Sequence, residues 1–374
     1  MRPLSLYIHV PFCTRRCPYC SFYHVHDSAA RMRTTVAALV REIRAALAQT
    51  GGNRTLHTVF VGGGTPTVLG QELLRDLFGA VAPWTSTEDT REITVEVNPE
   101  DVTAELLDVL ASLGVNRVSV GMQSMSPTGQ ATLGRCTPET NRRALSSVAD
   151  RFENFSVDVL LGVPGESTGE VTDTLTVALE FRPPHVSAYC LERGGDVDAA
   201  TGQFFESVDP EALAPAYLEA CRLLAARGYT HYEVSNFAQP GRESLHNCAY
   251  WTGSDYVGVG PGAHSFVDGR RFSNPPSLQQ YLGRPRHNPL DGRVFDARDD
   301  EAVRLERLML GLRTRTGLPR AACRCDDTEI RTLHDEGLLE CFDGNRVRLS
   351  DSGYLILDEI LFRIDARAAG NHRT

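Results

Sequence analysis

The sequence predicts an α/β protein: a partial, open (β/α)6 TIM-like barrel, a C-terminal α+β extension and a small winged-helix-like domain. Three observations lead to this fold class. Short β-branched runs alternate with longer amphipathic stretches up to about residue 195. Loops rich in glycine or proline follow most of the short runs. The chain has 374 residues, which is enough to bury one large core and a smaller one.

The short runs are the expected strands. Their nearly continuous Val, Ile and Leu content is typical of parallel strands that are buried on both faces. They lie at 6–10, 57–61, 92–97, 117–122, 155–161 and 185–191. Amphipathic segments fill the gaps and predict helices at 29–49, 69–81, 103–114, 138–151 and 168–181. Six such units are too few to close an eight-stranded barrel, so we expect an open one.

The second half of the chain is less regular. A Gly- and Asp-rich connection leads into a helix that ends at Arg227, and strands and loops follow it. The C-terminal part reads as helix, helix, two-strand ribbon and helix, which resembles a winged-helix module. The expected segments are a barrel core at 1–195, an extension at 196–282, a linker at 283–298, a winged-helix-like domain at 299–364 and a disordered tail at 365–374.

The charge of the chain limits its partners and its chemistry. The formal net charge is −10, and all 38 basic residues are arginine. Without lysine, the chain has no lysine nucleophile, no Schiff-base lysine and no phosphate-loop lysine. An acidic chain without a basic stripe is also unsuited to nucleic acid, because phosphate neutralisation supplies most non-specific affinity. We therefore expect no nucleic-acid partner.

The N-terminal segment and the cysteines predict a cytoplasmic protein. The apolar run in "MRPLSLYIHVPFC" is too short for a signal peptide, and no run reaches the roughly 18 residues that span a membrane. The 10 cysteines are then expected to be reduced thiols or metal ligands. Those interpreted as ordinary buried thiols are Cys136, Cys190, Cys221 and Cys341.

Three closely spaced cysteines follow the first expected strand. Cys13, Cys17 and Cys20 lie in "CTRRCPYC" with C-x3-C-x2-C spacing. Iron–sulfur clusters are normally held by four thiolates, so three can hold three corners of a [4Fe–4S] cube and leave one iron open to an external ligand. A zinc site completed by His24 or His26 stays open as an alternative, and so does a labile disulfide.

Other loops after the expected strands carry residues suited to a small polar ligand. The glycines of "GGGTP", at 62–66, remove side chains and let the backbone approach a ligand amine. Glu96 ends the third strand and can accept from a ribose hydroxyl, and Gln123 and Arg135 are further polar candidates. Each of these residues, taken in isolation, more often has a structural role. Their shared position after parallel strands predicts that they meet at one end of the barrel.

Nine motifs along the chain carry a family resemblance. They are "YIHVPFCTRRCPYCSF", "VFVGGGTPT", "VEVNPE", "VGMQS", "LGR", "DVLLGVPGE", "YEVSNFAQPG", "HNCAYW" and "VGVGPGAHS". With this combination the chain resembles the HemN/HemW family of radical S-adenosylmethionine proteins over nearly its whole length. The resemblance implies a radical S-adenosylmethionine barrel that uses a [4Fe–4S] cluster and S-adenosylmethionine as cofactors.

The resemblance also implies roles for single residues. It makes Cys13, Cys17 and Cys20 the cluster ligands. The residues that it places around S-adenosylmethionine are Tyr7, Tyr19, Gly63, Gly64, Thr65, Glu96, Gln123, Arg135 and Asp158. Phe22 stands where the oxidases of this family carry a fourth cysteine, which weighs against decarboxylation of coproporphyrinogen.

The motif "HNCAYW" resembles the H-N-x-x-Y-W motif of the heme-chaperone branch of the family. It implies heme as a further cofactor, with His246 as the binding residue. Imidazole is a common heme ligand, and Tyr250 and Trp251 can pack against a porphyrin face. The alternative is that His246 fixes a loop while the aromatic residues fill the core. Cys248 and His264 are weaker candidates for contact with the cofactor.

We therefore expect a heme-trafficking protein that passes heme to an unidentified acceptor protein. A reductant such as flavodoxin or ferredoxin is the expected electron source, and membrane contact is expected only through the acceptor. The alternative is a catalytic radical enzyme, either coproporphyrinogen III oxidase-like or a HemN-like methylase, so enzyme activity is left open. A DNA-binding regulator that uses the C-terminal domain is disfavoured by the acidic charge.

Overall fold

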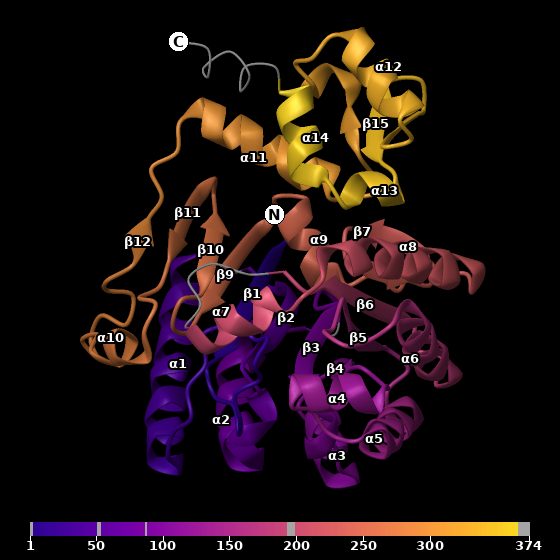
Figure 1. Cartoon of the computed structure of the whole chain (residues 1–374). Helices are drawn as coiled ribbons and strands as arrows, with labels where there is room; N and C mark the ends of the chain where they lie inside the picture. Colours follow the sequence, from indigo (N-terminus) through magenta and orange to yellow (C-terminus); the bar gives the residue numbers. More distant parts are fainter. Residues whose placement is uncertain (1–2, 51–53, 87, 193–198, 366–374) are drawn as a thin grey trace.

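The computed structural model describes residues 3–50, 54–86, 88–192 and 199–365, and its main feature is a sheet of six parallel strands in chain order (Figure 1). These strands are β1 (Leu4–Val10), β2 (Leu56–Gly63), β3 (Glu92–Val97), β4 (Arg117–Gln123), β5 (Phe155–Leu161) and β6 (His185–Cys190). Each lies within two residues of its predicted bounds. The prediction of a partial barrel with six β/α units is confirmed.

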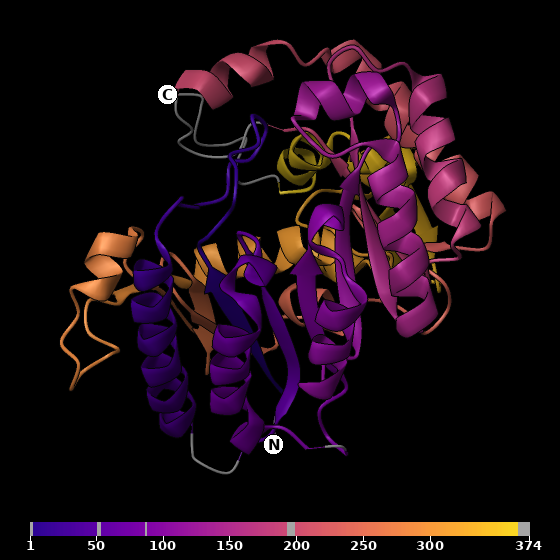
Figure 2. The same ribbon diagram turned by 90° about the horizontal axis from the view of Figure 1, so that it is seen from below.

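Helices follow the strands and cover the outer side of the bent sheet (Figure 2). They are α1 (Ala29–Gln49), α2 (Gly70–Val81), α3 (Ala104–Ser112), α4 (Pro127–Leu133), α5 (Pro138–Arg151) and α6 (Thr168–Glu180). Side-chain caps mark several of their starts, including a capping box in which Ser167 and Glu170 bond to each other's backbone amides. Helix α4 was not predicted, because seven residues are too few to display a helical period.

The extension continues the sheet at both edges instead of forming a separate layer. At one edge β8 (Asn236–Ala238) pairs antiparallel with β6, and β7 (Thr230–Glu233) pairs with β8. At the other edge β9 (Asp255–Val259) pairs parallel with β1, so a seventh parallel strand joins the six predicted ones. The remaining elements here are α7 (Ala199–Glu206), α8 (Pro210–Ala226), α9 (Leu245–Trp251), β10 (His264–Val267), β11 (Arg270–Ser273), α10 (Leu278–Leu282) and β12 (Val294–Phe295).

The C-terminal part forms a second, smaller sheet with helices around it. The strand order is β13-β15-β14, so a third short strand joins the predicted ribbon. The elements are α11 (Asp300–Leu312), β13 (Leu318–Pro319), α12 (Asp327–Asp335), β14 (Leu339–Phe342), β15 (Arg346–Leu349), α13 (Asp351–Tyr354) and α14 (Leu357–Ile364). Asp365, expected in the tail, is buried and paired with Arg304, whereas 366–374 lie outside the described residues.

The core lies between the sheet and its helices. Residues of β1 to β6 that are almost fully buried pack against the apolar faces of the surrounding helices in one continuous cluster. None of the described helices combines the length and the hydropathy that crossing a bilayer requires. The loops that follow β1 to β5 all leave the same end of the parallel strands, because all five strands run in one direction.

Candidate functional site

One cavity, about 350 Å³ in volume, gathers most of the predicted site residues at this end of the sheet. Its lining includes Cys13, Cys17, Cys20, Tyr19, Gly63, Gly64, Thr65, Glu96, Gln123, Arg135 and Asp158. Residues from six different loops and strands therefore meet around one space, as the shared position after parallel strands predicted. Of the residues in the predicted set, only Tyr7 and His246 lie away from it.

The three cysteines lie on one loop between β1 and α1. Backbone bonds from Cys13 N to Val25 O (3.3 Å) and from Val25 N to Pro11 O (2.7 Å) close the base of this loop. A turn within it brings Cys20 N to 3.1 Å from Cys17 O. All three cysteines are free thiols that are neither fully buried nor exposed. The loop therefore presents three unpaired sulfurs to the cavity from a closed base.

The placement of the three sulfurs bears on the zinc alternative. Two sulfurs on one zinc lie at most about 4.6 Å apart, because each Zn–S bond is about 2.3 Å long. Among the described residues, Cys13, Cys17 and Cys20 do not all have their sulfurs within 4.8 Å of one another. His24 and His26, the proposed additional zinc ligands, join no such group with them either. As placed here, the described thiols and imidazoles do not form a single-zinc site.

Burial makes two of the three thiols, Cys13 and Cys20, harder to ionise. Burial raises the pKa of Cys13, and burial raises the pKa of Cys20 to about 11. Two neighbours are placed to stabilise a thiolate: Arg135 Nη1 lies 3.7 Å from Cys17 Sγ, and Thr65 Oγ1 lies 3.6 Å from Cys13 Sγ. Iron would replace the thiol protons outright, as a coordinated metal does.

The glycine loop after β2 is packed against the backbone that leads into Cys13. Gly64 N donates to Val10 O at 2.8 Å, and Thr65 N donates to Phe12 O at 2.6 Å. A Cβ atom on Gly64 would lie 2.5 Å from the carbonyl oxygen of Phe12 and 2.6 Å from that of Val10. Gly63 has a φ of +99°, which side chains rarely adopt. The glycines are therefore needed to position the cysteine loop, independently of any ligand.

Two half-buried carboxyl groups line the cavity. Glu96 Oε2 accepts from Gly63 N at 3.0 Å, and Asp158 accepts from the hydroxyl of Ser119 at 3.1 Å and from that of Ser156 at 3.3 Å. Burial and the nearby Asp158 raise the pKa of Glu96 to about 8, and burial raises the pKa of Asp158. Such shifted carboxyls in a cavity are typical of ligand-binding positions.

Arg135 and Gln123 occupy constrained positions at the cavity. Arg135 Nη2 donates to Asn98 Oδ1 at 2.9 Å and to Gly121 O at 2.5 Å. Asn98 in turn donates to Thr65 Oγ1 at 2.9 Å, so it connects the arginine to the glycine loop. Gln123 has a φ of +69°, a strained backbone conformation of the kind that clusters at functional sites.

Three lining residues were not identified from the sequence. Asn98 lies in the motif "VEVNPE", which gave the signal of a loop after a strand but not of its side-chain role. Ser119 lies inside β4, where no pattern distinguishes it. Cys190, interpreted as an ordinary buried thiol, lines the cavity at the end of β6. Cys341, interpreted in the same way, is exposed.

The two predicted tyrosines lie on different cavities. Tyr19 lines the first cavity, with its ring 6.4 Å from that of Phe204 on α7. Tyr7, within β1, bonds through its hydroxyl to His9 Nδ1 at 3.0 Å and lines a second cavity of about 400 Å³. The second cavity shares Ser21 and Phe22 with the first. The other lining residues that matter here are Tyr250, Tyr256 and His264.

His246 is buried on helix α9, with 1% of its surface exposed. Its Nδ1 lies 2.8 Å from Thr58 Oγ1, its Nε2 lies 2.8 Å from the Tyr250 hydroxyl oxygen, and its ring packs 5.2 Å from that of Phe60. Burial lowers the pKa of His246 to about 3, so the ring is neutral. This is the structural role that was weighed as the alternative; to bind heme iron, His246 would need Tyr250 to move away.

Helix α9 is held by a buried residue that the sequence did not identify. Ser244 caps it by accepting from Asn247 N. Glu92, at the start of β3, accepts from Leu245 N at 2.9 Å and from His246 N at 3.1 Å. A carboxylate at a helix N-terminus stabilises the free amides there. The motif "HNCAYW" is therefore helical, and its position is fixed by side chains of β2 and β3, namely Thr58 and Glu92.

Comparisons with known proteins identify one family. Residues 7–178 match the family described as the radical SAM superfamily. The chain is 33% identical to "Heme chaperone HemW" of Mycobacterium tuberculosis (strain ATCC 25618 / H37Rv), with 96% of this chain and 94% of that protein covered. It is also 33% identical to "Heme chaperone HemW" of Escherichia coli (strain K12), with 96% and 97% covered.

A solved structure has the same fold. The structure of "Coproporphyrinogen III oxidase (HemN) from Escherichia coli", described as a radical SAM enzyme, superposes with a TM-score of 0.81 at 22% identity. The match covers 98% of this chain and 91% of that one. At this identity the likeness shows the fold, including the C-terminal part, and says nothing of the reaction.

Proposed function

The chain belongs to the HemN/HemW family of radical SAM proteins, and from this membership we propose that it is a heme chaperone. It binds heme and passes it to an acceptor protein, with a [4Fe–4S] cluster and an S-adenosylmethionine site in its barrel. The observation that carries this proposal is the match, at 33% identity and over 96% of the chain, to proteins named heme chaperones.

The cavity at the barrel end supports the two barrel cofactors. Cys13, Cys17 and Cys20 would hold three corners of the cluster, which would supply an open iron for the amine and carboxylate of S-adenosylmethionine and an electron for its reduction. Electrons would come from a small redox protein such as flavodoxin or ferredoxin. Arg135 compensates the negative charge of the thiolates, and the glycine loop keeps side chains out of the ligand's path.

We propose that Glu96 binds the ribose hydroxyls of S-adenosylmethionine as a carboxylate. Because its pKa is raised to about 8, the free protein must first release a proton, and affinity should rise about tenfold per pH unit up to about pH 8. The pH dependence of folding runs in the opposite direction to that of ligand affinity. The folded state holds the Glu96 proton more tightly than the unfolded state, so the free energy of unfolding of the free protein falls as the pH rises from about 4.5 to about 8.

Titration of cluster-loaded protein with S-adenosylmethionine across this pH range measures the effect. The ligand amine also titrates, so the matched control is Glu96→Gln, which cannot ionise. The variant should bind about 10- to 100-fold more weakly at high pH, the cost of one charged hydrogen bond, and with a flatter pH profile. An unchanged profile in Glu96→Gln would remove Glu96 from the binding site.

We propose the second cavity as the position of the heme. It is lined by Tyr7, Tyr250 and Tyr256, whose rings can pack against a porphyrin, and by the exposed imidazole of His264. Phe22, which is 69% exposed, lies between this cavity and the cluster cavity. In this arrangement His264 would be the axial-ligand candidate for heme iron, whereas His246 hydrogen-bonds to the Tyr250 hydroxyl.

Anaerobic heme titration, with absorption spectra recorded throughout, tests the function and the ligand separately. Wild-type protein should take up about one heme per chain and retain it on a desalting column. His264→Ala should alter the heme spectrum and weaken binding, and His246→Ala should act through α9 and also lower stability. Loss of the axial-ligand signal in His246→Ala alone would assign the ligand to His246. Failure of the wild-type protein to retain heme would overturn the proposed function.

The intact cluster cavity also supports a second candidate function, a catalytic radical enzyme. All three thiols and the polar lining are in place, and they are the parts that reductive cleavage of S-adenosylmethionine requires. Under reducing conditions, this candidate predicts deoxyadenosine release that depends on an added porphyrinogen and yields a modified porphyrin. Release without a modified product would leave the chaperone as the function.

A further inference from the structure

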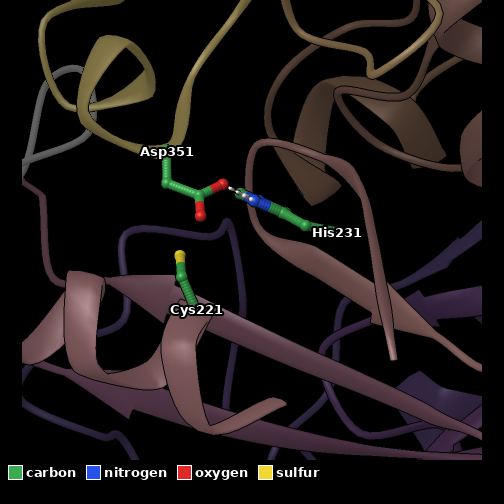
Figure 3. Close-up of side chains that lie close together, drawn as sticks. All are labelled: Cys221, His231 and Asp351. Carbon is green, nitrogen blue, oxygen red and sulfur yellow. Dashed lines mark hydrogen bonds and ion pairs between the residues drawn. The ribbon is translucent and has the colours of Figure 1, made fainter. Parts of the chain in front are cut away.

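Cys221, His231 and Asp351 form a cluster of potential metal ligands where the barrel extension meets the C-terminal domain (Figure 3), and none of the three lines either cavity. Their ligand atoms all lie within 4.8 Å of one another. Cys221 comes from α8, His231 from β7 and Asp351 from the first residue of α13. Three elements from two parts of the chain therefore place a thiol, an imidazole and a carboxyl group around one point.

The hydrogen bonds of His231 determine which ring nitrogen is free to bind a cation. His231 Nε2 lies 3.3 Å from Val234 O, and the Tyr217 hydroxyl donates to the same carbonyl at 2.8 Å. A carbonyl only accepts, so Nε2 carries its hydrogen and Nδ1 faces Asp351 Oδ1 at 2.8 Å. Two acceptors at this distance need a cation between or beside them, which is either a proton or a metal ion.

The third group distinguishes a metal from a proton. An imidazolium–aspartate pair needs no third group, whereas a metal ion would also bind the thiol of Cys221, which is 3% exposed and lies within the same cluster. Ring stacking of His231 on Phe237, with centroids 4.2 Å apart and an angle of 13°, fixes the imidazole toward the cluster. A backbone carbonyl that holds the other ring nitrogen is also the usual outer partner of a metal-binding histidine.

We propose that Cys221, His231 and Asp351 bind a zinc ion that joins the C-terminal domain to the barrel. One thiolate and one carboxylate balance the 2+ charge, with neutral imidazole as the third ligand and water in the fourth position. Binding releases the thiol proton and the proton between His231 and Asp351. The side chain of Asp351 is 40% exposed, which gives the ion access, and Arg315 lies 3.7 Å from its Oδ1 as a competing cation.

Such a site would reinforce contacts that already join the two parts at β7. Val234 N donates to Arg313 O at 3.0 Å, and Arg315 N donates to Tyr232 O at 3.0 Å. Asp351 begins the helix that packs beside α8, so a metal there fixes the position of the C-terminal domain rather than the chemistry of the barrel. The inference does not depend on heme binding or on the iron–sulfur cluster.

Zinc analysis of cluster-loaded protein tests the proposal, because the cluster keeps zinc from Cys13, Cys17 and Cys20. We expect about one zinc per chain after passage over a weak chelator, and a zinc-edge X-ray absorption spectrum with one sulfur neighbour among nitrogen and oxygen. Cys221→Ala should weaken zinc binding at least about 100-fold, beyond the loss typical of an outer-shell partner. Cys341→Ala, which removes an exposed thiol, is the matched control and should keep the zinc.

Three results would overturn the proposal. The first is wild-type protein without zinc after incubation with the metal, and the second is a zinc spectrum with several sulfurs or none. The third is equal zinc in Cys221→Ala and wild type. If Cys221→Ala does not fold, the sulfur count of the wild-type spectrum still decides the question. A proton in place of the metal would appear as a zinc-free protein that Asp351→Asn destabilises and Cys221→Ala does not.

Discussion

Replacing Cys17 by alanine is expected to abolish the iron–sulfur cluster. Anaerobic reconstitution with iron and sulfide should give close to four irons per chain in wild type and near background in the variant, because two thiolates cannot hold the cube. Arg135, whose Nη1 lies 3.7 Å from Cys17 Sγ, would then lose its anionic neighbour. Iron and sulfide analysis, with the charge-transfer absorption of the cluster, measures the loss.

Cys190→Ala is an informative control for this experiment, because its thiol lines the same cavity but lies on β6 rather than on the cysteine loop. It should keep a full cluster if the fourth iron is free for S-adenosylmethionine. A cluster that survives in the triple variant Cys13→Ala, Cys17→Ala, Cys20→Ala would contradict the assignment. Full loss in Cys190→Ala would instead make that thiol a fourth ligand and close the open iron.

Among changes at the interface between helix α1 of the barrel and the extension, Glu42→Ala is expected to lower the free energy of unfolding most. Glu42, on α1, is fully buried and accepts from Gly260 N at 3.0 Å and from the Tyr281 hydroxyl at 2.7 Å. It also pairs with Arg284 at 3.1 Å and with Arg293 at 3.4 Å. Removing the carboxylate leaves two buried guanidinium groups unpaired, which costs about 3–5 kcal/mol.

The midpoint of urea unfolding measures this loss, and Glu72→Ala is the matched control. Glu72 lies on α2, with 79% of its side chain exposed, 3.9 Å from Arg33, so its removal should cost less than about 1 kcal/mol. Because Glu42 holds Gly260, hydrogen exchange should also rise in the loop that leads to His264. Equal midpoints for the two variants would show that the buried ion pairs contribute no net stability.

Glu42 also shows where the sequence was insufficient. It falls on the apolar face of the helix 29–49, beside Leu39 and Ile43, where a charged residue contradicts the amphipathic pattern. Its two arginine partners come from the segment 283–298, which composition predicted to be a linker and which supplies Arg284, Arg293 and β12. No local pattern connects a glutamate to arginines about 240 residues away.

The candidate site was also predicted only in part, since some of its features follow from local sequence and others from tertiary contacts. The cysteine spacing and the loops after the strands predicted which residues meet at the cavity, because parallel strands bring their carboxyl ends to one edge. The motif "HNCAYW" predicted aromatic residues near a ligand but not the burial of His246, which depends on Thr58 of β2 and Glu92 of β3. The exposed imidazole of the second cavity belongs to His264 instead.

What the sequence alone determined are the features that repeat over a few residues: the six β/α units, their bounds and the cysteine loop. Strand and helix periods are set by local backbone geometry and burial, so they can be read from neighbouring residues. The pairing of β9 with β1, the burial of His246 and the meeting of His231 with Asp351, 120 residues apart, were decided only by the tertiary structure. Such contacts arise from how finished elements pack, and the energies that select one packing are spread over residues that are distant in the chain.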